Sequence, residues 1–268
     1  MEKLWADLTT DTFKALRVNE TAEMVILPIG STEDWGPHVP LGGDYIVAWE
    51  TSLRVARAMD NVYVLPVIPY GVSEIYMKNG TLSLSPETFK GILRDIFDSL
   101  ARQGVKRMMV VNTHVQNVDI IVNVSYEFRE KILVYSVYYW ALLKAIAPDL
   151  AKTNEYPEGH GSETVTAVLL AVNQDLVKMK QARRELPRPL TNKLLRFTPY
   201  DRSVLRVYKG FYNIPLYATE VTPSAVVGDP LKATKEQGEE YLRRGTEYMV
   251  MLINELKGLT LEDLKKVS

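Results

Sequence analysis

Cysteine is absent from the sequence, and histidine occurs only three times in 268 residues. The first absence excludes disulfide bonds, a thiolate nucleophile, and zinc or iron–sulfur sites with cysteine ligands. Any metal site must therefore be built from histidine and carboxylate side chains. The histidines and the acidic residues near them become the first candidates for a functional site.

The sequence also lacks an excess of either charge and any long apolar run. Lysine and arginine together number 32 and aspartate and glutamate 33, which gives a formal net charge of -1. This balance argues against nucleic acid as a partner. No apolar segment approaches the length of a membrane span, and the first residues lack the charged-then-apolar layout of a signal peptide. We therefore expect a cytoplasmic protein with neither a membrane nor a nucleic-acid partner.

Several common enzyme signatures are missing as well. No Gly-x-Ser-x-Gly motif is present, so a serine hydrolase with a nucleophile elbow is poorly supported. No Gly-x-Gly-x-x-Gly motif follows an expected strand and no Walker loop occurs, which removes the main nucleotide-cofactor interpretations. Hydrophobic residues make up 46% and charged residues 24% of the chain. Because these values are typical of globular proteins, disorder and coiled coil are also poor interpretations.

The apolar residues fall into short runs that predict buried strands. Four runs are rich in β-branched residues: residues 24–29, 62–68, 108–111 and 132–139. Helical patterns lie between and after them: residues 45–59, a segment that opens at Ser85, residues 118–131 and residues 232–256. Alternation of strand and helix predicts an α/β fold in which helices cover both faces of a mostly parallel sheet, a three-layer αβα arrangement.

The length suits one large α/β domain, and we expect residues 1–268 to form a single domain. Within it, residues 181–214 carry three prolines and scattered aromatic residues without a clear period. We interpret this segment as an irregular insertion or lid. The sequence contains no internal repeat and no low-complexity tract.

The three histidines, His38, His114 and His160, all fall in loops that contain glycine or proline. His114 follows one expected strand closely, and Glu33 follows another by a few residues. The carboxyl ends of parallel strands converge on one crevice, where ligands bind. With Asp44, these side chains offer the oxygen and nitrogen donors that zinc, manganese or iron(II) accept, and three protein ligands leave a position open for water. The alternative is a pair of loop-capping carboxylates and a hydrogen-bonded imidazole.

One known family resembles this chain in five motifs. Residues 27–44 read Leu-Pro-Ile-Gly-Ser-Thr-Glu-Asp-Trp-Gly-Pro-His-Val-Pro-Leu-Gly-Gly-Asp and resemble the creatininase signature. The other four motifs follow in the family's order: residues 69–73 with 80–89, residues 112–117, residues 160–166 and residues 228–230. The resemblance extends over most of the chain.

This resemblance implies a creatininase-like αβα fold and a metal-dependent hydrolase of a non-peptide C–N bond, in a cyclic amide or a formamide. It implies that Glu33, Asp44 and His114 hold a divalent cation, with Zn2+ first and Fe2+ or Mn2+ as alternatives. The family's second ion is less expected, because Trp35 replaces a histidine ligand and Gln116 replaces the glutamate of creatininase. We expect one ion per chain, a small-molecule substrate, and a homo-oligomer built from dimers, up to a hexamer.

The remaining site residues have both a functional and a structural interpretation. Glu163 matches a family glutamate and is expected to complete the metal shell or act as an acid or base; the alternative is a favourable helix N-terminal residue. His160 is interpreted as catalytic rather than as a backbone hydrogen-bonding group. Trp35 and His38 are candidate substrate-binding residues, by stacking on a flat ring and by orienting a ligand or water. The competing function is a ligand-binding protein that kept the fold and lost the chemistry.

Overall fold

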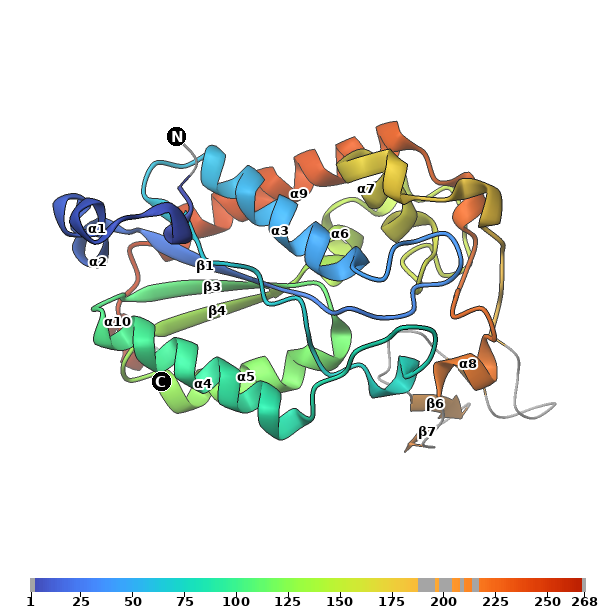
Figure 1. Cartoon of the computed structure of the whole chain (residues 1–268), viewed down its shortest axis with the longest axis horizontal. Helices are drawn as coiled ribbons and strands as arrows, with labels where there is room; N and C mark the ends of the chain where they lie inside the picture. The colour runs from blue at the N-terminus through green and yellow to red at the C-terminus, as the bar shows by residue number, and fades with distance from the viewer. Residues whose placement is uncertain (1–2, 188–195, 198–203, 208–209, 214–216, 267–268) are drawn as a thin grey trace.

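Four parallel strands form the central sheet of the chain, in the order β2-β1-β3-β4 (Figure 1). The structure is a computed structural model that describes residues 3–187, 196–197, 204–207, 210–213 and 217–266. The strands are β1 (Met24–Ile29), β2 (Val62–Val64), β3 (Arg107–Asn112) and β4 (Leu133–Tyr138). In the register, Met108 pairs with Val25 on one side and with Val134 on the other. The expected parallel sheet is confirmed.

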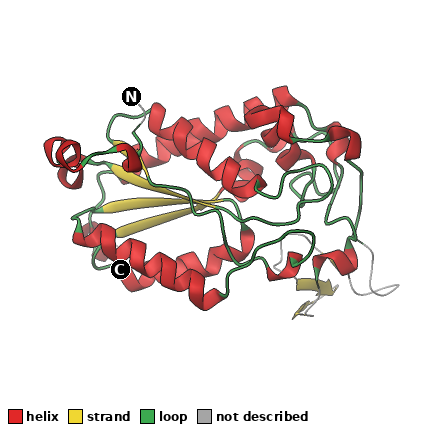
Figure 2. Cartoon of the chain, in the orientation of Figure 1, coloured by secondary structure: helices red, strands yellow, loops and turns green. Residues whose placement is uncertain are grey.

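Helices cover both faces of this sheet and complete three layers (Figure 2). One face carries α3 (Gly43–Arg57), α6 (Tyr139–Ile146), α7 (Glu163–Asn173) and α9 (Lys235–Leu256). The other face carries α4 (Pro86–Arg102) and α5 (Val118–Phe128). The other α-helices of the described residues are short: α1 (Thr10–Leu16), α2 (Val18–Thr21), α8 (Ala218–Val221) and α10 (Leu261–Lys265). The three-layer αβα fold predicted from the sequence is therefore confirmed.

The two helical layers bury opposite sides of each strand, because side chains alternate along a strand with a period of two. On β1, Met24 and Ile26 belong to the apolar core beneath α3, α7 and α9. Val25 and Leu27 belong to the core beneath α4 and α5. Strands that are buried on both faces read as continuous apolar runs, which is why this sheet was visible in the sequence.

Two element boundaries illustrate the local chemistry. The helix α4 begins at Pro86, and the hydroxyl of Ser85 accepts a hydrogen bond from the backbone nitrogen of Thr88 at 3.1 Å, as expected for an N-cap. The strand β2 ends at Val64, whereas the sequence predicted a strand over residues 62–68. Proline at position 66 has no N–H to donate to a neighbouring strand, so the apolar run continues past the end of the strand.

Much of the segment 181–214 lies outside the described residues. Its described pieces include three short strands, β5 (Arg196–Phe197), β6 (Val204–Val207) and β7 (Gly210–Asn213), which form an antiparallel sheet. Strands of two to four residues are too short for an alternating pattern to be recognised. The function of this segment as a lid, and the single-domain organisation, stay predictions. Among the described helices, none is both long enough and apolar enough to cross a membrane.

Candidate metal centre and active site

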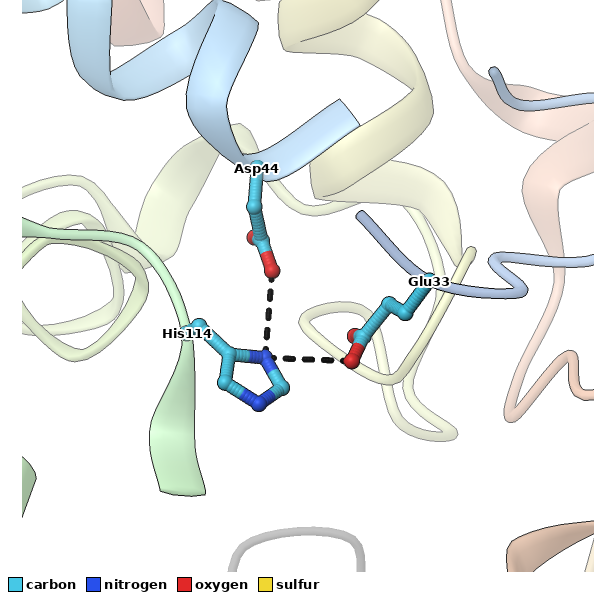
Figure 3. A group of neighbouring side chains, drawn as sticks. All are labelled: Glu33, Asp44 and His114. Atoms are coloured by element: carbon cyan, nitrogen blue, oxygen red, sulfur yellow. Dashed lines mark hydrogen bonds and ion pairs between the residues drawn. The ribbon is translucent and has the colours of Figure 1, made fainter. Parts of the chain in front are cut away.

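Three side chains from separate parts of the chain meet at the carboxyl edge of the sheet (Figure 3). Glu33 lies in the loop after β1, Asp44 lies in the first turn of α3, and His114 lies two residues after β3. Gly30 allows this loop to approach α3 closely, because a Cβ atom there would lie 2.3 Å from the backbone nitrogen of Tyr45. The convergence that parallel strands predicted is thus present for these three residues.

The donor atoms of this group are close enough to share one ion. His114 Nδ1 lies 3.3 Å from Glu33 Oε2 and 3.1 Å from Asp44 Oδ2. One ligand atom from each residue can be chosen so that all three lie within 4.8 Å of one another. None of the three residues is more than 2% exposed. Two carboxylates and an imidazole are a donor set that Zn2+, Mn2+ and Fe2+ accept.

The imidazole of His114 is oriented by contacts of Nε2, the ring nitrogen that faces away from the carboxylates. Its Nε2 lies 2.7 Å from the carbonyl oxygen of Val72 and 3.3 Å from Ser73 Oγ. A carbonyl oxygen can only accept, so Nε2 carries a hydrogen and Nδ1 is the nitrogen that faces the carboxylates. When Nδ1 gives up its proton to a cation, its lone pair points toward them. Glu33 Oε2, which faces Nδ1 at 3.3 Å, is buried and has no other donor within hydrogen-bond distance. A buried acceptor beside a lone pair is the arrangement that a bound cation would satisfy.

The charges of the group perturb one another strongly. Burial alone would raise the pKa of Glu33, but the charge of His114 and hydrogen bonds from His114 and His160 outweigh it and lower the pKa to about 2. Burial raises the pKa of Asp44, and its hydrogen bond with His114 only partly offsets that effect. Burial alone would lower the pKa of His114, yet the two carboxylates raise it well above its usual value. Without a cation, a proton on His114 balances the carboxylates.

Neighbouring groups hold the candidate ligands in place. Ser31 Oγ donates to Asp44 Oδ2 at 2.6 Å, and Trp140 Nε1 lies 3.4 Å from Asp44 Oδ1. Asn112 accepts from the backbone nitrogen of His114 at 3.1 Å and donates to its carbonyl oxygen at 2.7 Å. Such contacts orient the side chains that a metal ion needs.

His160 reaches the same site from the loop before α7. Its Nε2 lies 3.1 Å from Glu33 Oε1, and its Nδ1 lies 2.6 Å from the carbonyl oxygen of Ala225. Ala225 has a φ of 60°, in the left-handed region that alanine rarely adopts. The imidazole is stacked between Trp35 and Tyr76. The structure thus brings His160 to the candidate ligands, and its catalytic use stays a prediction.

Glu163 lies outside the group of three. It is the first residue of α7 and is fully buried. Its two carboxylate oxygens accept hydrogen bonds from the backbone nitrogens of Lys152 and Thr153, at 2.7 and 2.8 Å, and from the side chain of Gln237. These contacts tie the loop before α7 and the helix α9 to the start of α7. The group of three therefore does not include Glu163, and its expected role as a metal ligand or as an acid or base stays a prediction.

The two candidate substrate-binding residues are both buried. Trp35 is 4% exposed, and His160 covers one face of its indole, so a substrate cannot stack on that face. His38 is 1% exposed, and its Nε2 lies 3.0 Å from Thr166 Oγ1. Gln116 Oε1 is also buried, without a hydrogen-bond partner. Substrate binding by Trp35 and His38 stays a prediction.

Sequence reasoning missed Tyr76, Ala225 and the carbonyl group of Val72. Val72 is one of the family-like residues 69–73, and Tyr76 lies between them and the family-like residues 80–89. This was a signal that this part of the chain is near the site. Nothing in the spacing predicts a ring stacked on His160, because that contact joins segments far apart in the sequence. A backbone carbonyl as a partner carries no residue signature at all.

Comparisons with known proteins show the family of this chain. The family model "Creatininase: Creatinine amidohydrolase" matches residues 6–253. The chain is 30% identical over 203 residues to a creatinine amidohydrolase of Pseudomonas putida, which covers 66% of this chain and 72% of that protein. It is 26% identical over 235 residues to a mycofactocin precursor peptide peptidase of Mycolicibacterium smegmatis, covering 83% and 81%. The solved structure "Creatininase Mn" superposes with a TM-score of 0.76 at 25% identity, over 97% of this chain and 100% of that one. The chain therefore belongs to the creatininase family.

Proposed function

We propose that this creatininase-family hydrolase cleaves a non-peptide C–N bond in a small cyclic amide or a formamide, with one divalent cation held by Glu33, Asp44 and His114. The observation that carries the proposal is the placement of His114 Nδ1 3.3 Å from Glu33 Oε2 and 3.1 Å from Asp44 Oδ2, with all three side chains buried. Similarity to a creatinine amidohydrolase supports the amide chemistry, and similarity to "Creatininase Mn" supports a divalent cation. Zn2+ is our first candidate, with Mn2+ or Fe2+ as alternatives.

Each group then has a stated task. A divalent cation held by Glu33, Asp44 and His114 would lower the pKa of water at the site and would polarise the substrate carbonyl. His160 holds its Nδ1–H on the carbonyl oxygen of Ala225, so Nε2 is the nitrogen that exchanges a proton beside Glu33. Nε2 takes the proton that the attacking water releases as its oxygen bonds to the carbonyl carbon, and gives that proton to the leaving nitrogen as the C–N bond breaks. Burial of His114 and Glu33 keeps bulk water away from the charges.

A peptide amide is the second candidate substrate. The specific observation in its favour is the similarity to a mycofactocin precursor peptide peptidase, which extends over 83% of this chain. The same donor set and the same proton carrier serve a linear amide as well as a cyclic one, because both reactions pass through attack on a carbonyl carbon. The two candidates differ in the size of the group that must enter the pocket.

A substrate panel tests the proposal. The full chain, supplied with Zn2+ or Mn2+, is incubated with creatinine, other cyclic amides, N-formyl compounds and short peptides, and release of amine or formate is measured. Asp44→Asn should abolish turnover of any accepted compound, whereas Asp149→Asn, at an exposed position, should leave it unchanged. Tight binding of a compound without turnover, in a chain that takes up no metal, would instead favour the ligand-binding function.

We also propose that the chain assembles into a homo-oligomer built from dimers, up to a hexamer. Exposed apolar side chains give modest support, since Tyr126 is 68% and Met251 52% exposed. Light scattering at micromolar concentration tests this expectation, and a monomeric mass would contradict it.

A further inference from the structure

The imidazole of His160 is enclosed between two parallel aromatic rings. Its centroid lies 3.9 Å from the ring of Trp35, with 4° between the planes, and 3.8 Å from the ring of Tyr76, with 10° between the planes. Trp35 and Tyr76 are 4% and 6% exposed, so neither ring is free to swing into solvent. We call these three rings the His160 sandwich.

The edge of the imidazole is held in addition to its faces. Nδ1 lies 2.6 Å from the carbonyl oxygen of Ala225, and Nε2 lies 3.1 Å from Glu33 Oε1. Turning the ring about its Cβ–Cγ bond would sweep its edges through the space that Trp35 and Tyr76 fill. The sandwich therefore keeps one ring nitrogen directed at Glu33.

The two outer rings are also connected to each other, without involving His160. The backbone nitrogen of Asp34, next to Trp35, donates to Thr81 Oγ1 at 2.9 Å. Thr81 Oγ1 in turn donates to the carbonyl oxygen of Tyr76 at 2.6 Å. Asn79 Nδ2 donates to Asp34 Oδ2 at 2.6 Å. These hydrogen bonds connect the loop that carries Trp35 with the segment that carries Tyr76. None of them involves His160, so they support the spacing of the two rings without the imidazole.

Tyr76 has further support on its other side. It is the last residue of the 3-10 helix η2 (Glu74–Tyr76) and packs with Ala218 and Ala225 in a small buried cluster. Ala225 belongs to the same buried cluster as Tyr76, and its carbonyl oxygen accepts the hydrogen bond from His160. One short segment therefore fixes both the ring that covers His160 and the acceptor for its Nδ1–H.

We propose that Tyr76 is a positioning residue: with Trp35 it clamps His160 so that Nε2 stays beside Glu33 and in line for proton transfer. The aromatic ring carries this role, because the recorded contact is between ring faces. The catalytic consequence rests on the proposed function, whereas the clamp is a property of the chain itself.

The clamp can be measured without a substrate. Because the chain has three histidines, NMR of the histidine-labelled full chain in the presence of Zn2+ resolves each ring, and His160→Gln assigns the His160 signals. Stacked rings shield the His160 Cε1 and Cδ2 protons, so these signals should lie upfield of ordinary histidine positions. Tyr76→Leu should move them downfield and Tyr76→Phe should not. Tyr248→Leu, at a 37% exposed position of α9, is the matched control.

On a substrate accepted in the panel, Tyr76→Leu should lower kcat about tenfold or more with little change in KM. Tyr76→Phe, which keeps the ring, should have nearly the kcat of the unmodified chain. Unshielded His160 signals in the unmodified chain overturn the clamp even if Tyr76→Leu does not fold. An unchanged kcat in Tyr76→Leu, or a Tyr76→Phe variant as slow as Tyr76→Leu, overturns the positioning role. Failure of the proposed function looks different: the unmodified chain then shows shielded signals but neither bound metal nor turnover.

Discussion

His114 donates a hydrogen bond from Nε2 to the carbonyl oxygen of Val72, at 2.7 Å. This contact selects which ring nitrogen faces Glu33 and Asp44, because a backbone carbonyl offers no hydrogen of its own. The orientation of the candidate ligand therefore depends on the loop between β2 and α4 as well as on β3. Metal binding should accordingly be sensitive to groups that never touch the ion.

Metal affinity should rise with pH. In the metal-free chain Glu33 and Asp44 raise the pKa of His114 well above its usual value, after burial has been outweighed. A cation must displace this proton, so affinity should increase about tenfold for each pH unit as long as the metal-free His114 is protonated. Calorimetric titration with Zn2+ in buffers of different ionisation enthalpy counts the proton released.

Two histidine variants test whether that proton belongs to His114. His114→Gln should weaken Zn2+ binding by about 100-fold or more and remove the proton release. His38→Gln changes a buried histidine outside the group of three. It should leave both the Zn2+ affinity and the proton release unchanged. Equal loss of binding in the two variants would show that general destabilisation, and not ligand removal, lowers the affinity.

Glu163→Gln should separate structure from metal binding. Both oxygens of Glu163 accept hydrogen bonds, and an amide would present N–H groups to the N–H of Lys152 or Thr153. The free energy of unfolding should therefore fall by about 2 kcal/mol, the usual effect of leaving buried donors unpaired. Urea unfolding measures this loss. Metal content per folded chain should not change, and a loss of metal would support Glu163 as a ligand.

His38 should make the protein less stable in mild acid. Burial lowers the pKa of His38 from 6.5 to about 4, with a smaller contribution from the charge of His160. Between these two values the unfolded chain binds a proton that the folded chain does not, so stability falls as the pH decreases from about 6.5 toward 4. At pH 5 the loss from this residue is about 2 kcal/mol.

Urea unfolding at pH 7 and pH 5 checks this expectation. The free energy of unfolding should change less between pH 7 and pH 5 in His38→Gln than in the unmodified chain. The change should be about 2 kcal/mol smaller, because glutamine does not titrate. A variant that loses as much stability as the unmodified chain would place the acid sensitivity elsewhere, for example at the candidate metal ligands.

The sheet was predictable because its chemistry is local. A strand such as β1 is buried on both faces, so its apolar run is visible without any knowledge of its neighbours. The end of β2 was not visible in the same way, since the run of residues 62–68 continues past Pro66 although the strand does not. The strands β5, β6 and β7 were missed because each has four residues or fewer.

The candidate site was predictable where a residue able to bind a metal lies near the carboxyl end of a strand. Glu33, Asp44 and His114 combine ligand chemistry with positions near the ends of β1 and β3, and the structure brings them together. Glu163 has the same chemistry and a family-like position, yet its direction depends on how α7 packs against α9, which no local pattern reveals. The stack of Tyr76 on His160 depends on tertiary packing in the same way.

Trp35 determines how far the family's two-metal arrangement applies to this chain. Its buried ring is stacked on His160 at the position where the resemblance places a histidine ligand, and Gln116 Oε1 is buried without a partner. An indole cannot bind a cation through a ring nitrogen lone pair, and a neutral carboxamide is a weak ligand, so we expect about one ion per chain. Trp35→His combined with Gln116→Glu should raise metal content toward about two ions, as in known two-metal sites. Metal analysis of the dialysed full chain measures this, with Trp5→His as a control outside the site. Two ions bound to the unmodified chain would contradict the idea that Trp35 prevents binding of a second ion. An unchanged metal content in the double variant would contradict it as well.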